Sequence, residues 1–334
     1  MIDQELENLE SEKESENIFI LRAFFSWIKT HLKFFFIPGY VDDELFERQR
    51  EYEKSKSQRK FISRLKSTLT AIGFIIIIGV VTCAVFAPWI SVFSFDTLTS
   101  KQWGSWDPPS PVHPLGQTAL GADVLGRIIW GARSSLTVAL PALFMSVSLG
   151  MVVGIIAAYY GGWVDTIIMR IMDIFLAFPF IILVLFIIAI LGTEMEYIII
   201  AYGILGIAGY SRLIRGSVLQ AKNLPYVEAA RVAGASNARI MFKHILPNCI
   251  QPIIVAFTFD IGGVILSLAG LSFLGFGDPT LIEWGYDINL ARYRFYDAPW
   301  ASFWPGFMIV LTVLGFMLLG DGLRDALDPR LRNI

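Results

Sequence analysis

The sequence predicts an all-α integral membrane protein with six transmembrane helices, and three observations lead to this fold class. The 334-residue chain is 55% hydrophobic and only 17% charged, with a mean hydropathy of +0.59. A soluble domain carries about a quarter charged residues, so a water-facing surface would be difficult to build here. Long apolar runs without Asp, Glu, Lys or Arg recur along the chain, and a cluster of basic residues precedes the first of them. Runs of about 20 such residues are long enough to cross a bilayer.

The charge-free runs set the bounds of the expected spans, because a charge at the bilayer centre costs several kcal/mol. The fifth span is interrupted only by Asp260, and Pro179 is expected to kink the third. The predicted spans cover residues 71–93, 135–160, 168–191, 197–219, 252–274 and 302–320, with an external loop at 94–131 and a cytoplasmic loop at 220–251.

The basic residues predict the orientation of the spans. Residues 48–66 hold eight Lys or Arg against two Glu, which marks this side as cytoplasmic. Counting the crossings from there places the loop at 220–251 and the C-terminus on the same side. The segment between the fifth and sixth spans is acidic and is expected outside. We therefore expect a multi-pass protein of the cell membrane with both termini in the cytoplasm.

Residues 1–66 form a predicted cytoplasmic extension that precedes a transmembrane domain at 67–334. Within it, residues 18–36 place their polar side chains on one stripe at helical spacing, while Phe, Ile and Leu cover much of the rest. This pattern predicts an amphipathic helix lying in the cytoplasmic interface, with its cations near anionic lipid headgroups. A packed cytoplasmic extension is the alternative.

Several kinds of chemistry are not expected in this chain. Cys83 and Cys249 lie in apolar surroundings and form neither a disulfide framework nor a zinc site. His31, His113 and His244 share no metal-ligand spacing, and the chain has no Gly-x-x-x-x-Gly-Lys-Ser/Thr phosphate loop. We expect no catalytic residue, no bound cofactor or metal, and no nucleic-acid partner.

Two segments outside the membrane are rich in aromatic residues. The segment at 94–131 combines Trp103 and Trp106 with four prolines, which disfavours helix and predicts an ordered loop with an aromatic surface. The segment at 278–303 contains Trp, Tyr and Phe side chains between acidic residues. It is interpreted either as an aromatic belt at the headgroup level or as a docking surface for an external protein.

A short helix is predicted inside the loop at 220–251. Asn223 can cap it, Pro225 suits its first turn, and Glu228 favours its N-terminus. Gly234 can end it in a left-handed cap. Between them the helix carries very small side chains, Ala229, Ala230 and Ala233. Such a helix is shaped to enter a groove of another protein, although a simple connector helix would have the same spacing.

The same residues resemble the EAA loop found in permease subunits of ATP-binding-cassette importers. Glu228-Ala229-Ala230 is followed four residues later by Gly234, and then by His244-Ile-Leu-Pro-Asn248. Further motifs in one register resemble the second ("C") permease subunit of the dipeptide and oligopeptide branch. These are His113-Pro-Leu-Gly116, Gly131-Ala-Arg-Ser-Ser-Leu136, Leu176-Ala-Phe-Pro179, Leu271-Ser-Phe-Leu-Gly275 and Gly320-Asp-Gly-Leu-Arg-Asp-Ala-Leu-Asp-Pro-Arg330.

This resemblance implies the type I importer permease fold and a set of partners. The partners would be a second permease subunit, two ATP-binding subunits that hold ATP and Mg²⁺, and an external substrate-binding protein. Substrates would be di- or oligopeptides, with nickel, an opine or a sugar as the alternative. Coupling to an ATPase subunit would use the loop residues Tyr226, Glu228, Ala229, Ala230, Ala233 and Gly234. Two different classes of protein also remain open: a secondary transporter driven by an ion gradient, and a receptor or structural subunit.

The sequence departs from the family pattern at two places. Gln117-Thr-Ala-Leu-Gly-Ala-Asp123 replaces the usual Thr-Asp-x-x-Gly-Arg-Asp, and Leu268 replaces the usual acid near the outer end of the fifth span. Asp260 lies two turns before Leu268. Because an acid within a span usually faces a cavity or a partner, Asp260 is a candidate for the translocation path.

Four further charged positions are interpreted as structural. Arg170 and Asp173 lie three residues apart and could pair with each other. Arg212 and Arg215 lie near the inner end of the fourth span and are expected to extend their head groups to the interface.

Overall fold

The computed structural model describes residues 67–100 and 105–327, all of which belong to the unit Ser63–Ile334. Within these ranges the chain forms helices joined by loops, with one isolated antiparallel bridge between Gln117 and Asp123 and no strand. The interfacial helix predicted at 18–36 lies outside the described residues and stays a prediction.

Five helices are long and apolar enough to cross a membrane. The central residues of each helix coincide with a predicted span. Long runs of apolar side chains are stable only in lipid or in a protein interior, and in lipid the backbone must satisfy its own hydrogen bonds by forming a helix. These helices are α3 (Thr68–Ile90), α5 (Val124–Tyr160), α8 (Met195–Ala221), α12 (Gln251–Phe273) and α14 (Trp300–Leu327).

The third predicted span is two helices rather than one kinked helix. The first, α6, covers Gly162–Leu176, the second, α7, covers Phe180–Leu191, and their axes differ by 85°. Pro179 is the N-cap residue of α7, with an extended backbone. Proline cannot donate a helical hydrogen bond, and it disfavours helical backbone at the preceding residue. The expected bend at Pro179 is thus present, but it is a complete break at which one helix ends and another starts rather than a kink in one helix.

Helix α5 begins eleven residues before the predicted span, so the loop predicted at 94–131 is partly helical. Asp123 caps α5 by accepting a hydrogen bond from the Gly126 amide at 2.7 Å. A short helix, α4 (Phe95–Thr99), also lies in the predicted loop. The charge-free run that set the predicted span begins after Arg133, but neither Arg133 nor Arg127 ends the helix, and Arg127 lies in a buried ion pair.

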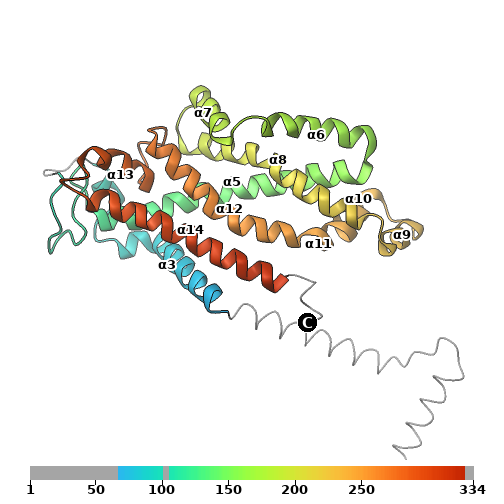
Figure 1. The fold of residues 1–334 in the computed structure, drawn as a ribbon, viewed down its shortest axis with the longest axis horizontal. Helices are drawn as coiled ribbons and strands as arrows, with labels where there is room; N and C mark the ends of the chain where they lie inside the picture. Colours follow the sequence, from blue (N-terminus) through green and yellow to red (C-terminus); the bar gives the residue numbers. More distant parts are fainter. Residues whose placement is uncertain (1–66, 101–104, 328–334) are drawn as a thin grey trace, which may run out of the picture. The chain divides into compact units, whose positions relative to one another are not determined.

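Glycines allow α5 and α8 to pack closely along much of their length (Figure 1). A methyl group placed on Gly154 of α5 would lie 2.4 Å from the Ser211 carbonyl oxygen of α8. On the α8 side, a methyl group on Gly206 would lie 2.3 Å from the Ser146 hydroxyl. Small residues are the usual means of close helix approach in a membrane, where packing rather than water exclusion drives association.

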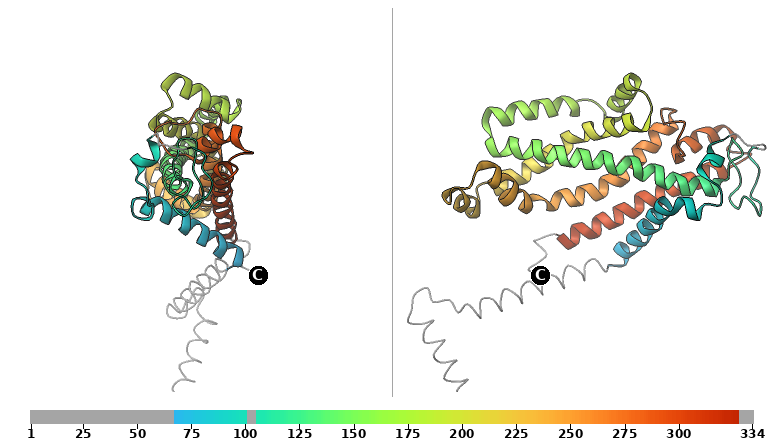
Figure 2. Two further views of the ribbon diagram at one scale, coloured as in Figure 1. Left: turned by 90° about the vertical axis from the view of Figure 1, so that its left-hand side faces the viewer. Right: turned by 180° about the vertical axis from the view of Figure 1, so that it is seen from behind.

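The shorter elements gather at the two ends of this helix bundle, as Figures 1 and 2 show. At one end, the connection from α8 to α12 contains α9 (Pro225–Val232), α10 (Asn237–Arg239), the π-helix η1 (Ile240–Ile245) and α11 (Leu246–Cys249). The other end carries α4, the segment 105–123, α13 (Trp284–Ala291) and the 3₁₀-helix η2 (Arg292–Arg294).

Candidate functional site

The short helix predicted in the connection between α8 and α12 is present as α9. Pro225 occupies its first turn, as predicted, where the missing amide hydrogen is not needed. Asn223 was expected to cap the helix, but it does not occupy the N-cap position. Leu224 stands at that position and forms no side-chain capping hydrogen bond, so Pro225 rather than a polar cap sets the start of the helix.

The end of α9 is a Schellman motif built on Gly234. The Ala235 amide donates to the Ala230 carbonyl at 3.1 Å, and the Gly234 amide donates to the Arg231 carbonyl at 3.0 Å. Gly234 has φ +78°, in the left-handed region that glycine enters without steric cost. The left-handed cap predicted from the sequence is thus the observed geometry.

The six loop residues named from the sequence lie on two different faces of α9 and its end. Tyr226 and Ala230 pack against the core together with the buried Val227. The other four residues, Glu228, Ala229, Ala233 and Gly234, are exposed. Val232 also lies on the exposed side, with 90% of its surface accessible. The free surface therefore carries small or apolar side chains together with Glu228 and the exposed Arg231.

Two hydrogen bonds fix the loop to the end of α5. The Lys222 ammonium donates to the Ala158 carbonyl at 2.8 Å, and the Tyr159 hydroxyl donates to the Asn237 side-chain carbonyl at 2.8 Å. Buried Ile240 and Ile245 of η1 join the same core cluster as Val227. Helix α9 is thereby held on the helix bundle, and its free face points away from it.

A second candidate site is a cavity of about 450 Å³. Its wall is mostly apolar and includes residues of α5, α6, α7, α8 and α12, among them Leu143, Leu176, Phe180, Leu213 and Val264. Ser146 is satisfied inside the bundle, since its hydroxyl donates to the Ala142 carbonyl at 3.0 Å. A cavity of this size is in the range that holds a small molecule.

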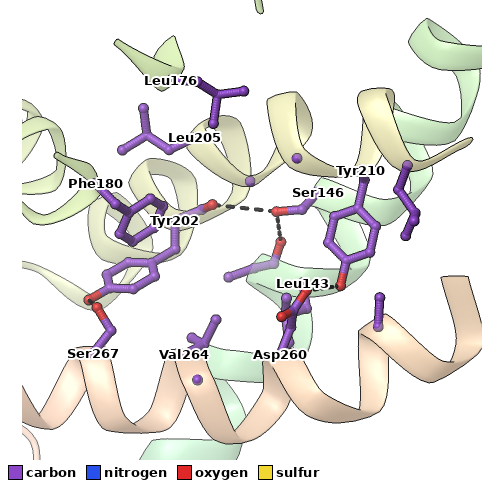
Figure 3. A pocket seen from close by; sticks show the side chains of 16 residues that line it. Leu143, Ser146, Leu176, Phe180, Tyr202, Leu205, Tyr210, Asp260, Val264 and Ser267 are labelled. Atoms are coloured by element: carbon purple, nitrogen blue, oxygen red, sulfur yellow. Dashed lines mark hydrogen bonds between the residues drawn. The ribbon is translucent and has the colours of Figure 1, made fainter. Parts of the chain in front are cut away.

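Two polar pairs face this cavity (Figure 3). The Tyr210 hydroxyl donates to the Asp260 carboxylate at 2.6 Å, and the Tyr202 hydroxyl lies 3.0 Å from the Ser267 hydroxyl. In each pair a tyrosine of α8 meets a residue of α12. Asp260, selected from the sequence as an acid within a span, thus lines this cavity.

The acids of α6 pair with the arginines of α8. Arg215 binds Asp165 through two nitrogens, at 2.7 and 2.6 Å, and Arg212 binds Asp173. The sequence did not predict these partners on the neighbouring helix, and the expectation that both arginine head groups reach the interface stays a prediction. Arg170 also approaches Asp173, at 3.7 Å, as predicted, but this pair is largely exposed.

The opposite end of the bundle contains a buried ion pair between α5 and α13. Arg127 Nη2 lies 2.7 Å from Asp287 Oδ1, its Nε donates to the same carboxylate at 2.8 Å, and its Nη1 donates to the Leu98 carbonyl at 2.8 Å. The indole of Trp284 donates to the Ile128 carbonyl at 3.1 Å and occupies the space beside Gly131, where a side chain would collide. This network joins α4, α5 and α13.

Glu283 is a buried acid next to this network. The Ser272 hydroxyl donates to one of its carboxylate oxygens, while the other has no partner among the described residues. Burial raises the pKa of Glu283 to about 7, and the hydrogen bond from Ser272 partly opposes this rise. Burial also raises the pKa of Asp287, against the effect of the neighbouring Arg127.

The aromatic residues of segment 278–303 divide into two groups. Trp284 is buried, whereas Tyr293, Phe295 and Tyr296 are exposed, Tyr296 with 98% of its surface. Arg292 lies over the ring of Tyr293 at 4.5 Å. The exposed group has the composition expected of either a headgroup belt or a docking surface, so both interpretations stay open.

A comparison with known protein families identifies the chain. The sequence pattern of the family described as "Binding-protein-dependent transport system inner membrane component" matches residues 150–333, more than half of the chain. The match includes the loop with α9, the residues around Asp260, and α14. The chain belongs to this family. The predicted fold class, an all-α membrane protein of the importer permease type, is thereby confirmed, with five long apolar helices plus the bent pair α6–α7.

Curated relatives agree with this membership. The chain is 41% identical to the dipeptide transport system permease protein of Alkalihalophilus pseudofirmus, over 80% of this chain and 88% of the relative. It is 45% identical to the glutathione transport system permease protein of Pectobacterium atrosepticum, over 67% and 75% of the two chains. Among solved structures, a chain titled as part of an amino acid ABC transporter has a TM-score of 0.49 and 17% identity, covering 60% of this chain and 94% of that one.

Within this inner-membrane component, sequence reasoning missed several residues that the structure brings together. The partnership of Arg127 with Asp287 joins residues 160 positions apart and has no local signal. Tyr210 was likewise not connected with Asp260. Val232, by contrast, follows Glu228 by one helical turn, so helical periodicity could have placed it on the free face of α9. No group of three His, Cys, Asp or Glu side chains in the described part of the chain could hold a metal ion.

Proposed function

The chain is a permease subunit of an ATP-binding-cassette importer, and we propose that its solutes are di- or oligopeptides. The relatives named for dipeptide and glutathione transport support this substrate class. An external binding protein would deliver the peptide, and a second permease subunit would complete the pathway. Nickel, an opine or a sugar remains the alternative cargo, whereas family membership does not favour an ion-driven transporter.

We further propose that α9 couples the chain to an ATPase subunit. The observation that carries this proposal is the free face of α9, formed by Glu228, Ala229, Val232 and Ala233 on a firmly held loop. Its small side chains allow the helix backbone to come close to a groove wall. ATP and Mg²⁺ would be held by the ATPase subunits, and closure of that pair would displace α9 and change the equilibrium between two states of the pathway.

This assignment also sets the orientation of the chain. The loop between α8 and α12 and both termini would lie in the cytoplasm, in agreement with the basic residues at 48–66. The end with α4 and α13 would face the binding protein outside the cell.

Replacing one small side chain on the free face tests the coupling. Ala229→Glu should leave the subunit assembled in the membrane but abolish peptide-stimulated ATP hydrolysis and uptake, because a longer charged side chain prevents close docking. Ala229→Ser, which keeps the side chain small, should retain both activities. Normal transport and normal ATP turnover in the Ala229→Glu complex would show that α9 is not the coupling helix.

A further inference from the structure

The cavity lined by Tyr202, Tyr210, Asp260 and Ser267 has an unusual electrostatic composition. Asp260 contributes its one carboxylate, and the remaining lining residues are apolar, hydroxyl-bearing or glycine. Asp260 lies close to the middle of the 23-residue helix α12, far from both helix ends. A carboxylate at this depth costs several kcal/mol unless it faces water, a partner or a ligand.

Asp260 differs from Asp165, Asp173 and Asp287 because no cation in the described part of the chain pairs with it. Asp165, Asp173 and Asp287 each contact an arginine side chain. Asp260 receives one hydrogen bond, from the neutral Tyr210 hydroxyl, and no ion pair within the described ranges. It is also exposed in the isolated chain and lines the cavity. The lining of the cavity contains no Lys, Arg or His that could balance the negative charge of Asp260.

We propose that Asp260 binds the protonated amino group of the transported peptide, an inference that rests on the proposed function. The ammonium group would form a charge-assisted hydrogen bond with the carboxylate, the strongest kind of hydrogen bond available in such a cavity. The Tyr210 hydroxyl holds the carboxylate in place on the other side. The subsite thus recognises a primary ammonium group on a small, partly apolar molecule.

The distance between the two polar pairs suits a short peptide. Asp260 and Ser267 are seven residues apart on α12, which corresponds to about 10 Å along the helix axis. An extended chain of three residues covers about the same length. With its amino group at Asp260, such a peptide would place a carbonyl or amide group near the hydroxyls of Tyr202 and Ser267 (Figure 3).

The same composition argues against a divalent metal ion as the cargo of this subsite. Metal ions of this charge are held in proteins by several carboxylate, imidazole or carbonyl ligands. Here the lining has one carboxylate, which carries a single negative charge, and the other polar side chains are neutral hydroxyls. One negative charge matches one ammonium group.

A thiol introduced beside Asp260 can report on this subsite without transport. Gly263 lies one helical turn from Asp260 on the wall of the cavity, and a side chain added there meets no atom within 4 Å. In the assembled complex, with Cys83 and Cys249 replaced by alanine, Gly263→Cys should react several-fold faster with a cationic than with an anionic methanethiosulfonate. Dialanine should slow the cationic reaction, while N-acetyldialanine should not.

Neutralising the carboxylate should remove both effects. In the Asp260→Asn background the preference for the cationic reagent should fall to its value in free solution, and dialanine should no longer protect. Asp260→Glu should restore both in part. Asp173→Asn, which neutralises an acid that is paired with Arg212, should leave them unchanged. An unaltered reagent preference or equal protection by both peptides would overturn the proposal.

Uptake measurements separate this inference from the proposed function. With the same binding protein throughout, Asp260→Asn should lower the ratio of dialanine to N-acetyldialanine uptake about tenfold or more. If wild-type complexes import dialanine but the ratio is unchanged in the variant, the ammonium subsite is wrong and the peptide importer stands. If wild-type complexes import neither peptide in an ATP-dependent way, the peptide function itself is wrong, and this inference with it.

Discussion

Arg127 of α5 and Asp287 of α13 form a buried ion pair, with 2.7 Å between Arg127 Nη2 and Asp287 Oδ1. The pair joins the start of one long helix to the segment between two others, and both side chains are almost completely buried. Removing one partner leaves an uncompensated charge in a low-dielectric environment, which is far more costly than losing an exposed pair.

Arg127→Met should therefore destabilise the chain by about 3–5 kcal/mol, the usual cost of breaking a buried pair. The double variant Arg127→Met/Asp287→Leu should recover much of this loss, because no unpaired charge then remains. Thermal unfolding of the purified complex measures both effects. Asp297→Ala, which removes an exposed pair with Arg294, serves as the control and should leave the unfolding temperature unchanged.

Glu283 predicts a pH-dependent stability. Its folded-state pKa is about 7, above the ordinary value of 4.5, so the folded state binds the proton more tightly than the unfolded state. The stabilising contribution of this group is therefore fully present below pH 4.5 and is lost as the pH rises through 7, a change of at most about 3 kcal/mol. Glu283→Gln should raise the unfolding temperature at pH 8 and flatten its decline between pH 5 and 7. The same decline in Glu283→Gln as in the wild type would assign it to another group.

The left-handed backbone at Gly234 predicts a specific order among substitutions. Space is not limiting, because an added side chain would meet no atom within 4 Å. A β-branched residue is strained at φ +78°, whereas asparagine tolerates this region. Gly234→Val should thus uncouple ATP hydrolysis from uptake while the subunit remains assembled, and Gly234→Asn should retain most of the coupling. Equal activities in the two variants would mean that the end of α9 need not keep this geometry.

Two glycines of the α5–α8 pair should respond in opposite ways to alanine. A methyl group at Gly154 would collide with the Ser211 carbonyl and Ile214, so Gly154→Ala should destabilise the bundle by about 1–3 kcal/mol. A methyl group at Gly216 meets nothing within 4 Å, so Gly216→Ala should be neutral or slightly stabilising. Unfolding temperatures of the two variants provide the comparison.

The positions of the spans were predictable because a charge in lipid is costly, so each span appears in the sequence as a run without charged residues. The same reasoning failed at the start of α5, because the charge-free run begins only after Arg133, whereas the helix extends further toward the N-terminus and includes Arg127. The charge of Arg127 is compensated by Asp287, 160 residues later, and no local pattern reports such a pairing. The break at Pro179 was located correctly, but its 85° angle depends on how α7 packs against α8.

The candidate sites divide in the same way. Pro225 and Gly234 have local backbone roles, so the sequence alone predicted the start and the end of α9. Which side of α9 faces the bundle depends on the η1 residues that cover Val227, so Tyr226 and Ala230 could not be separated from the exposed residues beforehand. Asp260 was recognisable as an acid in a span, but its partner Tyr210 and the cavity between α8 and α12 required the three-dimensional structure.

Helix α5 gives the two ends of the bundle a common mechanical element. Its 37 residues form one uninterrupted helix of about 55 Å. Lys222 and Asn237 hold one end of it, and Asp287 holds Arg127 at the other. A helix resists compression along its axis more than it resists bending. A force applied to the loop that holds α9 would therefore be transmitted along the axis of α5. If α9 is the coupling helix, as proposed, a displacement at this end would be carried by α5 to the buried pair of Arg127 and Asp287 on the opposite side of the membrane.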